Sequence, residues 1–86
     1  MWQLDYEAQA SKFLSKADKQ TQVKILKYLK KAAQSPRSFG KALTGGLRGL
    51  WRYRIEDYRV ICELRDQKLV VLVIDIGHRS AVYKNR

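Results

Sequence analysis

The stretch LRGLWRYRIEDYRVICELRD, residues 47–66, constrains the fold more than any other part of the chain. On both sides of Glu56-Asp57, apolar residues alternate with polar ones, which is typical of strands that bury one face. Glu56-Asp57 is not the strongest turn dipeptide, but if it forms a two-residue turn the stretch becomes an antiparallel β-hairpin. In that register residue 55 pairs with 58, 54 with 59, 53 with 60, 52 with 61 and 51 with 62.

Because paired residues share a face, this register gives the hairpin two chemically different surfaces. The predicted core face carries Trp51, Tyr53, Ile55, Tyr58, Val60, Cys62 and Leu64. The opposite surface, here called the arginine face, carries Arg52, Arg54, Arg59, Ile61 and Glu63. Arg54 lies directly across from Arg59, and like charges in that position destabilise a sheet. A single carboxylate cannot neutralise three guanidinium groups.

Two interpretations of the arginine face stay open from this pattern. Guanidinium groups present a rigid fork that matches phosphate oxygens, which favours a phosphate-binding surface. Alternatively, the face is a solvated polar surface with ion pairs to Glu63 and Asp57. The chain carries 18 basic and 8 acidic residues, a net charge of +10. That excess indicates an anionic partner, whether nucleic acid, an acidic protein or a membrane surface.

Upstream of the hairpin the sequence predicts a short strand and two helices. Trp2, Leu4 and Tyr6 alternate with polar residues, as in a strand with one buried face. A first helical stripe follows, made of Ala10, Phe13, Leu14 and Ala17. A second helix is expected to begin at Asp18, a good N-cap, and to end close to Pro36. Its apolar stripe is Val23, Leu26, Leu29 and Ala33, flanked by Ile25, Tyr28 and Ala32. Lys24, Lys27, Lys30 and Lys31 form its solvated side.

After the helices the sequence predicts a loop over 37–46 and the two hairpin strands at 48–56 and 58–65. One more strand, residues 68–77, follows the hairpin. If Asp66-Gln67 is also a two-residue turn, the core face gains Leu69, Val71 and Val73, with Asp75 opposite Tyr58. The arginine face then gains Val70, Leu72 and Ile74 beside Ile61. These four residues form an exposed apolar strip, which often marks a protein interface.

The predicted fold is therefore α+β: a strand, a helical hairpin and a three-strand antiparallel meander. These elements form one domain of 86 residues, with a sheet of about four strands and the helices on one face. One cysteine, Cys62, allows no internal disulfide and is expected to be a small buried residue. With one histidine it cannot build a zinc site. No apolar run spans a membrane and no signal layout is present, so a soluble cytoplasmic protein is expected.

The sequence as a whole resembles the RelE family of bacterial toxins, within the RelE/ParE superfamily. The residues that carry the resemblance are Leu47-Arg48-Gly49, Arg52 and Arg54, Tyr58-Arg59, Gly77-His78-Arg79 and Val82-Tyr83. The resemblance implies a ribosome-dependent endoribonuclease that cuts mRNA in the A site without a metal or other cofactor, using the neighbouring 2′-hydroxyl as nucleophile.

The resemblance also assigns roles to individual residues. Arg59 and Arg79 would clamp the scissile phosphate, and Tyr83 would stack on or orient the substrate nucleotide. Arg52 and Arg54 stand where the best-known members have lysines, and they would support the phosphate or help in proton transfer, although arginine is a poor base. Arg48 would bind the RNA or its phosphate. His78 is the candidate general acid or base, because imidazole titrates near neutral pH.

The partners implied are a small acidic RelB-like antitoxin, the ribosome and mRNA. Operator DNA would be contacted only through the antitoxin, and no membrane is involved. The antitoxin would bind to the apolar strip of Ile61, Val70, Leu72 and Ile74. Two alternatives stay open: a ParE-like toxin that binds DNA gyrase, and a non-catalytic module that binds nucleic acid or the antitoxin.

Overall fold

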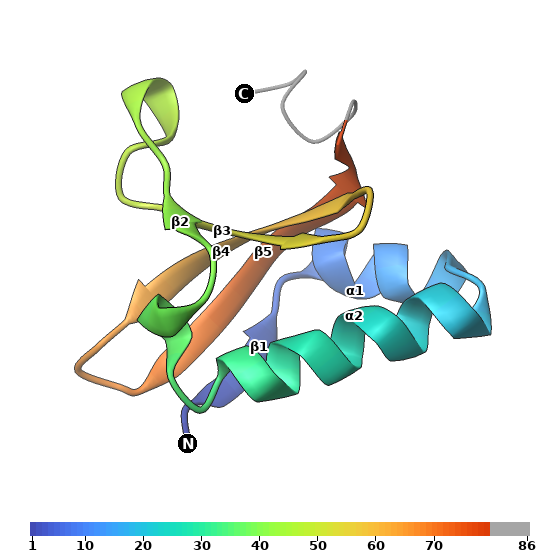
Figure 1. The fold of residues 1–86 in the computed structure, drawn as a ribbon, viewed down its shortest axis with the longest axis horizontal. Helices are drawn as coiled ribbons and strands as arrows, with labels where there is room; N and C mark the ends of the chain where they lie inside the picture. The colour runs from blue at the N-terminus through green and yellow to red at the C-terminus, as the bar shows by residue number, and fades with distance from the viewer. Residues whose placement is uncertain (80–86) are drawn as a thin grey trace.

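Two helices pack on one face of a five-stranded mixed sheet (Figure 1). The structure is a computed structural model that describes residues 1–79. Its elements are β1 (Gln3–Tyr6), α1 (Ala8–Lys16), α2 (Lys19–Ala32), η1 (Pro36–Ser38), β2 (Lys41–Ala42), η2 (Gly45–Leu47), β3 (Trp51–Ile55), β4 (Tyr58–Arg65) and β5 (Val70–His78). No helix in this part of the chain is both long and apolar enough to cross a membrane.

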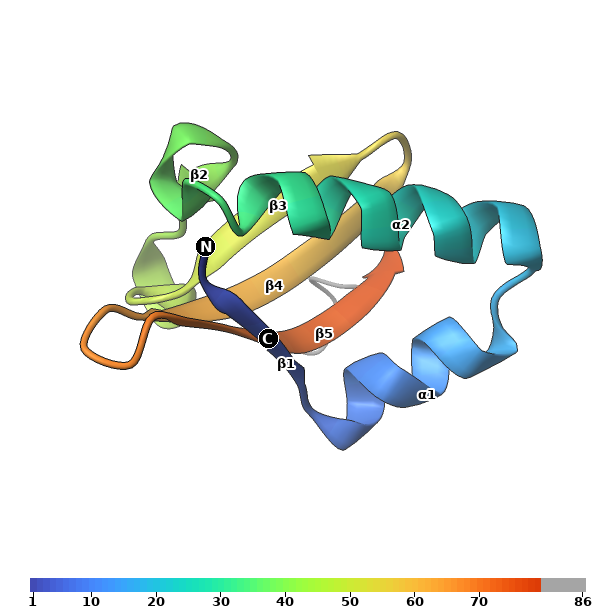
Figure 2. The ribbon, with the colours of Figure 1, turned by 90° about the horizontal axis from the view of Figure 1, so that it is seen from below.

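The α+β prediction is confirmed, but the sheet has one strand more than expected. The strand order is β1-β5-β4-β3-β2, and Figure 2 shows both helices on the same side of this sheet. β1 runs parallel to β5, with Gln3 beside Val70 and Tyr6 beside Val73. The extra strand, β2, is a two-residue pairing with β3 inside the segment predicted as a loop.

The second helix begins as predicted, but its buried stripe is rotated. Asp18 caps α2, because its carboxylate accepts a hydrogen bond from the Thr21 backbone N–H at 3.0 Å, and this bond lowers the pKa of the carboxyl group. The residues that α2 buries are Ile25, Leu29 and Ala32. Val23, which was predicted to be in the stripe, is 49% exposed, because the helix turns its Ile25 side toward the sheet.

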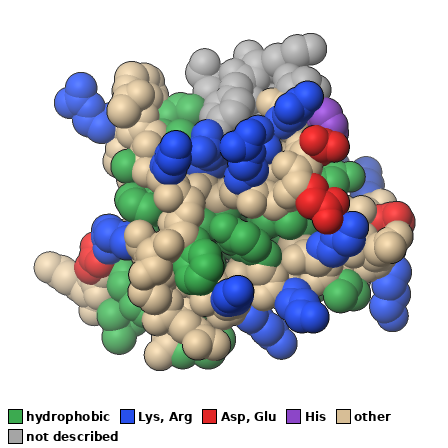
Figure 3. All heavy atoms as spheres, viewed as in Figure 1, with side chains coloured by type: hydrophobic (Ala, Val, Ile, Leu, Met, Phe, Trp, Pro, Cys, Tyr) green, Lys and Arg blue, Asp and Glu red, His purple; other side chains and the backbone are tan. Residues whose placement is uncertain are grey.

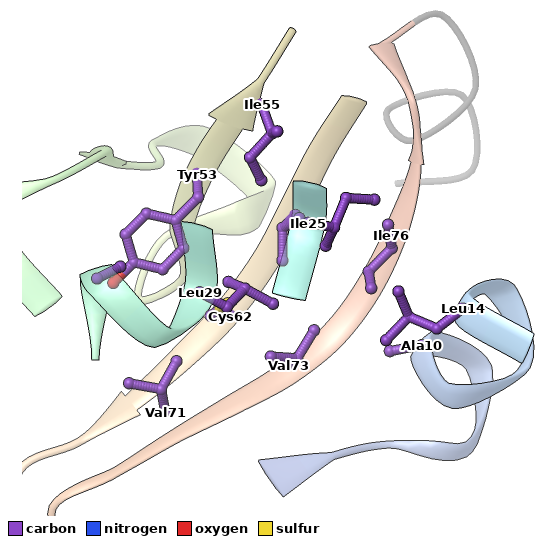
Figure 4. Close-up of a cluster of buried hydrophobic side chains, with 12 residues drawn as sticks. Ala10, Leu14, Ile25, Leu29, Tyr53, Ile55, Cys62, Val71, Val73 and Ile76 are labelled. Atoms are coloured by element: carbon purple, nitrogen blue, oxygen red, sulfur yellow. The ribbon is translucent and has the colours of Figure 1, made fainter. Parts of the chain in front are cut away.

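The core lies between the helices and the sheet (Figure 4). Leu29 from α2 and the inward residues of β3, β4 and β5 form its centre, while Ala10 and Leu14 from α1 pack near Ile76. Cys62 is fully buried, as predicted, and burial raises the pKa of its thiol.

The β3–β4 hairpin has the predicted register at every position. Trp51 pairs with Cys62, Arg54 with Arg59 and Ile55 with Tyr58. The turn is accommodated by Glu56, which takes a positive φ of 54°. Its carboxylate also binds Lys24 Nζ of α2 at 3.1 Å, which ties the turn to the helical layer.

The β4–β5 pairing differs from the prediction in two ways. The turn spans four residues rather than two, so Leu69 lies in it and is 52% exposed instead of joining the core. A β-bulge then leaves Ile74 without a ladder partner, because Cys62 pairs with Val73 while Ile61 pairs with Asp75. Asp75 consequently lies opposite Ile61 rather than opposite Tyr58.

The predicted exposed apolar strip is wrong. Ile61 is fully buried and Val70 is 9% exposed, while Leu72 and Ile74 are only partly exposed. Ile61 pairs with Arg52, which is itself half-buried. Arginine stems can cover apolar neighbours, so basic residues on a face do not leave the apolar residues beside them open to solvent.

The helix stripe gives a direct stability test. Replacing the fully buried Leu29 with alanine is expected to lower the free energy of unfolding by about 2–5 kcal/mol, because it removes core contacts and leaves a cavity. Replacing Val23, which the sequence pattern placed in the same stripe, should cost well under half as much. Urea denaturation of both variants measures the difference, and equal losses would contradict the observed rotation of α2.

A second test concerns the segment that leads into β2. Gly40 has a φ of 71°, and a Cβ there would lie 2.2 Å from the Arg52 carbonyl oxygen. Gly40→Ala is therefore expected to lower the free energy of unfolding by more than about 1 kcal/mol. Gly46→Ala is the matched control, because a Cβ at Gly46 would meet nothing within 4 Å. Thermal melts that rank the two variants equally would contradict this close approach.

Candidate active site

Three arginines lie together on the surface of the sheet that faces away from the helices. Arg54 and Arg59 are direct cross-strand partners, and Arg52 is two positions from Arg54 on the same strand. Figure 3 shows Lys and Arg side chains gathered along this side of the molecule. Tyr53 and Val60, the neighbours of these arginines in the sequence, are fully buried on the opposite face. Burial of one face of the hairpin thus sets the direction of all three arginines.

Glu56 and Glu63, two of the acidic residues of the β3–β4 hairpin, bind cations other than the three arginines. Three ion pairs join residues of the described part of the chain: Lys24 with Glu56, Arg37 with Asp66 and Arg65 with Glu63. Glu63 is the carboxylate that shares the arginine face, and it is held by Arg65 at the far end of β4. The solvated interpretation required Glu63 and Asp57 to pair with the arginines, and neither does so in these three pairs.

Arg52 carries a buried donor that has no acceptor. Its Nε is inaccessible to solvent and has no hydrogen-bond partner among residues 1–79. Buried polar atoms are nearly always satisfied in folded proteins, and an exception often marks a place where a ligand or water completes the bond. An anion on the arginine face would supply such an acceptor.

Arg59 is the most buried of the three, at 7% exposed. Its Nη1 donates long hydrogen bonds to the carbonyl oxygens of Glu56, at 3.5 Å, and Tyr58, at 3.4 Å. Both carbonyls belong to the hairpin turn or the residue next to it. The guanidinium group is therefore held close to the turn rather than extended into solvent.

The other predicted site residues are placed differently from one another. The Arg79 backbone N–H donates to the Asp57 carbonyl at 2.8 Å, so Arg79 lies beside the same turn. Arg48 is exposed and follows η2, in a segment that rises on the side of the sheet away from the helices (Figure 1). Tyr83 lies outside the described residues.

His78 lies on the helix side of the sheet, away from the arginine face. It pairs with Tyr58, and the two rings meet edge to face with centroids 6.1 Å apart. Its neighbour Gly77 pairs with Arg59. The sequence could not separate His78 from the arginines, because the bulge at Ile74 reverses the alternation of β5.

The arrangement can bind and stabilise a phosphate group whose negative charge increases during a reaction. Guanidinium groups donate to phosphate oxygens but do not accept protons at ordinary pH. Within residues 1–79, no three His, Cys, Asp or Glu side chains are grouped in a way that could hold a metal ion.

Comparison with known proteins places the chain in a family. The family model described as "ParE toxin of type II toxin-antitoxin system, parDE" matches residues 4–83. The sequence matches no curated protein.

The fold is similar to several solved toxin structures. The isolated RelE toxin of Escherichia coli is 28% identical, with a TM-score of 0.80, and the match covers 99% of this chain and 94% of that one. The toxin–antitoxin complex RelBE2 from Mycobacterium tuberculosis contains a chain 20% identical, with a TM-score of 0.83 and coverage of 91% and 98%. The YoeB/ParE toxin from Agrobacterium tumefaciens is 20% identical, with a TM-score of 0.74 and coverage of 88% and 96%. The chain therefore belongs to the ParE toxin family of type II toxin–antitoxin systems, within the RelE/ParE superfamily.

Proposed function

We propose that this toxin is a ribosome-dependent endoribonuclease that cuts mRNA in the A site and thereby inhibits translation in the cytoplasm. The observation that carries the proposal is the arginine face, where Arg54 and Arg59 are direct cross-strand partners and Arg52 is two positions from Arg54 on the same strand. The likeness to the E. coli RelE toxin, at 28% identity, supports the same assignment.

The proposed reaction is an internal transfer at the phosphodiester. The 2′-oxygen attacks phosphorus, the bond from phosphorus to the 5′-oxygen breaks, and a 2′,3′-cyclic phosphate and a 5′-hydroxyl result. Negative charge increases on the non-bridging oxygens, and preorganised arginines stabilise it there. Arg59 and Arg79, both held at the hairpin turn, are proposed to clamp this phosphate, and Arg52 and Arg54, with Arg48, to support it.

Proton transfer needs different groups. A base must take the proton of the 2′-hydroxyl and an acid must protonate the 5′-oxygen, and arginines serve poorly as the base. Tyr83 is proposed to stack on the nucleotide. His78 was predicted as acid or base; its position on the helix side requires the RNA to pass around the end of β5 for the imidazole to reach the reaction.

The proposed partners follow from the family and from the charge. A small acidic RelB-like antitoxin would mask the arginine face, and it would carry any contact with operator DNA. Solved relatives include the complex RelBE2 from M. tuberculosis and the RelBE complex of E. coli. Ile61 and Val70 are buried, so in the predicted antitoxin-binding strip only Leu72 and Ile74 are partly exposed to a partner.

A second candidate function is inhibition of DNA gyrase. The match to the ParE family model favours it, because the superfamily fold serves gyrase-poisoning toxins as well as mRNA-cleaving ones. The arginine face would then bind an acidic protein surface or DNA rather than a scissile phosphate.

An assay with purified protein, programmed ribosomes and a defined A-site codon tests the proposal. Wild-type protein is expected to cut the mRNA in the A site and to leave free RNA intact. Arg59→Lys, Arg79→Ala and Tyr83→Ala are each expected to lower the cleavage rate by roughly tenfold or more, since each removes or weakens a proposed contact to the reacting nucleotide.

Arg65→Lys is the matched control for the arginine variants. Arg65 lies on the same strand as Arg59 but at the opposite end, where it binds Glu63. Cleavage by this variant should equal that of the wild type, and circular dichroism should show that every variant is folded. Intact mRNA on the ribosome together with gyrase-dependent DNA breaks would replace this proposal with the second candidate.

A further inference from the structure

A groove of about 590 Å³ opens on the helix side of the sheet, at the end where β4 begins and β5 finishes. Its floor is aromatic: Phe13 of α1, Tyr58 of β4 and His78 of β5 all line it. Phe13 and Tyr58 meet edge to face with centroids 5.9 Å apart, and Tyr58 meets His78 in the same way at 6.1 Å. The three rings form a continuous apolar surface, and His78 at its end is exposed.

Two lysines and two aspartates are among the residues that line the groove. Lys12 and Lys16 lie one helical turn apart on α1, and both line the groove. α1 contains no acidic residue, and no ion pair between described residues involves either lysine. Asp18 also lines the groove; it caps α2 and keeps its negative charge, because the hydrogen bond from Thr21 lowers the pKa of its carboxyl group. The rim therefore offers two exposed ammonium groups to an anion.

The lining of the groove includes an oriented amide, that of Gln9. Gln9 Nε2 donates to the carboxylate of Asp75 at 2.7 Å, and Asp75 is only 7% exposed. Because a carboxylate only accepts, this bond fixes which end of the amide faces Asp75. Gln9 Oε1 is then the end of the amide that does not face Asp75, and an amide oxygen can accept a hydrogen bond from an N–H group of a nucleobase.

The groove adjoins the candidate active site around the end of the sheet. The Tyr58–His78 pair on the groove side is next in the ladder to the Arg59–Gly77 pair on the arginine side. One residue of backbone thus separates an aromatic floor on one face from a phosphate-binding arginine on the other. A single strand of RNA bound at Arg59 has a short path into the groove.

We propose that this groove binds a nucleotide of single-stranded RNA that flanks the scissile phosphate, with the base on Phe13, Tyr58 and His78 and a phosphate between Lys12 and Lys16. Aromatic floors beside cationic side chains are the general means by which proteins hold unstacked nucleotides. The inference rests on the proposed function for its choice of RNA, but the groove itself is independent of cleavage. An apolar anchor on an acidic peptide is the competing ligand.

Fluorescence anisotropy with a labelled, fully 2′-O-methylated RNA hexamer tests the inference, because this RNA lacks the 2′-hydroxyl and cannot be cut. Two variants address the groove: the double substitution Lys12→Gln with Lys16→Gln, and Phe13→Leu. Each is expected to weaken RNA binding roughly fivefold or more. The lysine variant should also lower the dependence of the affinity on salt concentration, because it removes two charges that contact phosphate. Thermal melts establish that both variants are folded.

Lys27→Gln with Lys30→Gln is the matched control, since it removes the same charge from exposed lysines of α2 outside the groove. An equal loss of affinity in the control would overturn the inference, because the groove would then add nothing beyond overall charge. Unchanged affinity in both groove variants would also overturn it. The groove would instead be assigned to a protein ligand if the groove variants bound RNA as the wild type does but bound poly-glutamate more weakly.

The outcome is separable from that of the proposed function. Photocrosslinking of a hexamer carrying 4-thiouridine is expected to label peptides containing Phe13 or Tyr58. Crosslinks there without cleavage on programmed ribosomes would retain the groove as an RNA site and reject the endoribonuclease. Cleavage on ribosomes with no crosslink in these peptides would retain the enzyme and reject the groove.

Discussion

The whole arrangement depends on the burial of one face of the β3–β4 hairpin. Tyr53, Val60 and Cys62 lie under the helices, and side chains alternate strictly along a strand. A slip of one residue would exchange the faces, exposing the apolar side chains and burying the arginines. The hydrophobic effect that holds the core therefore also keeps Arg54 and Arg59 side by side, in spite of their mutual repulsion. The site is maintained by the packing of the residues between the arginines.

The bulge at Ile74 is the second determinant of the site. It inserts one residue into β5, so the alternation after it is reversed relative to β4. Without the bulge, His78 would share a face with Arg59, and Gly77 would lie on the helix side. With it, the imidazole joins Tyr58 and Phe13 on the helix side. One unpaired residue thus decides which chemistry lies on each side of the strand end.

The sequence predicted the features that local chemistry controls. The hairpin register followed from period-two alternation, and the start of α2 followed from the capping preference of Asp18. It did not predict features that depend on distant contacts. The two-residue β2 has no pattern of its own and exists because Gly40 lets the chain approach β3. The length of the β4–β5 turn and the bulge depend on how β5 fits between β4 and β1, so Leu69 and Asp75 were misplaced.

The parallel pairing of β1 with β5 has a consequence for how the protein folds. In this sheet β1 has β5 as its neighbour, yet the two strands are separated by more than sixty residues of chain. During synthesis β1 leaves the ribosome first, but it cannot pair until β5 has been synthesised. Closing so long a loop is entropically unfavourable, and contacts of this kind slow folding. The helices and the β3–β4 hairpin can form early from local contacts, but the sheet is complete only after β5 has arrived, so the strand end at His78 and Arg79 takes its final place last.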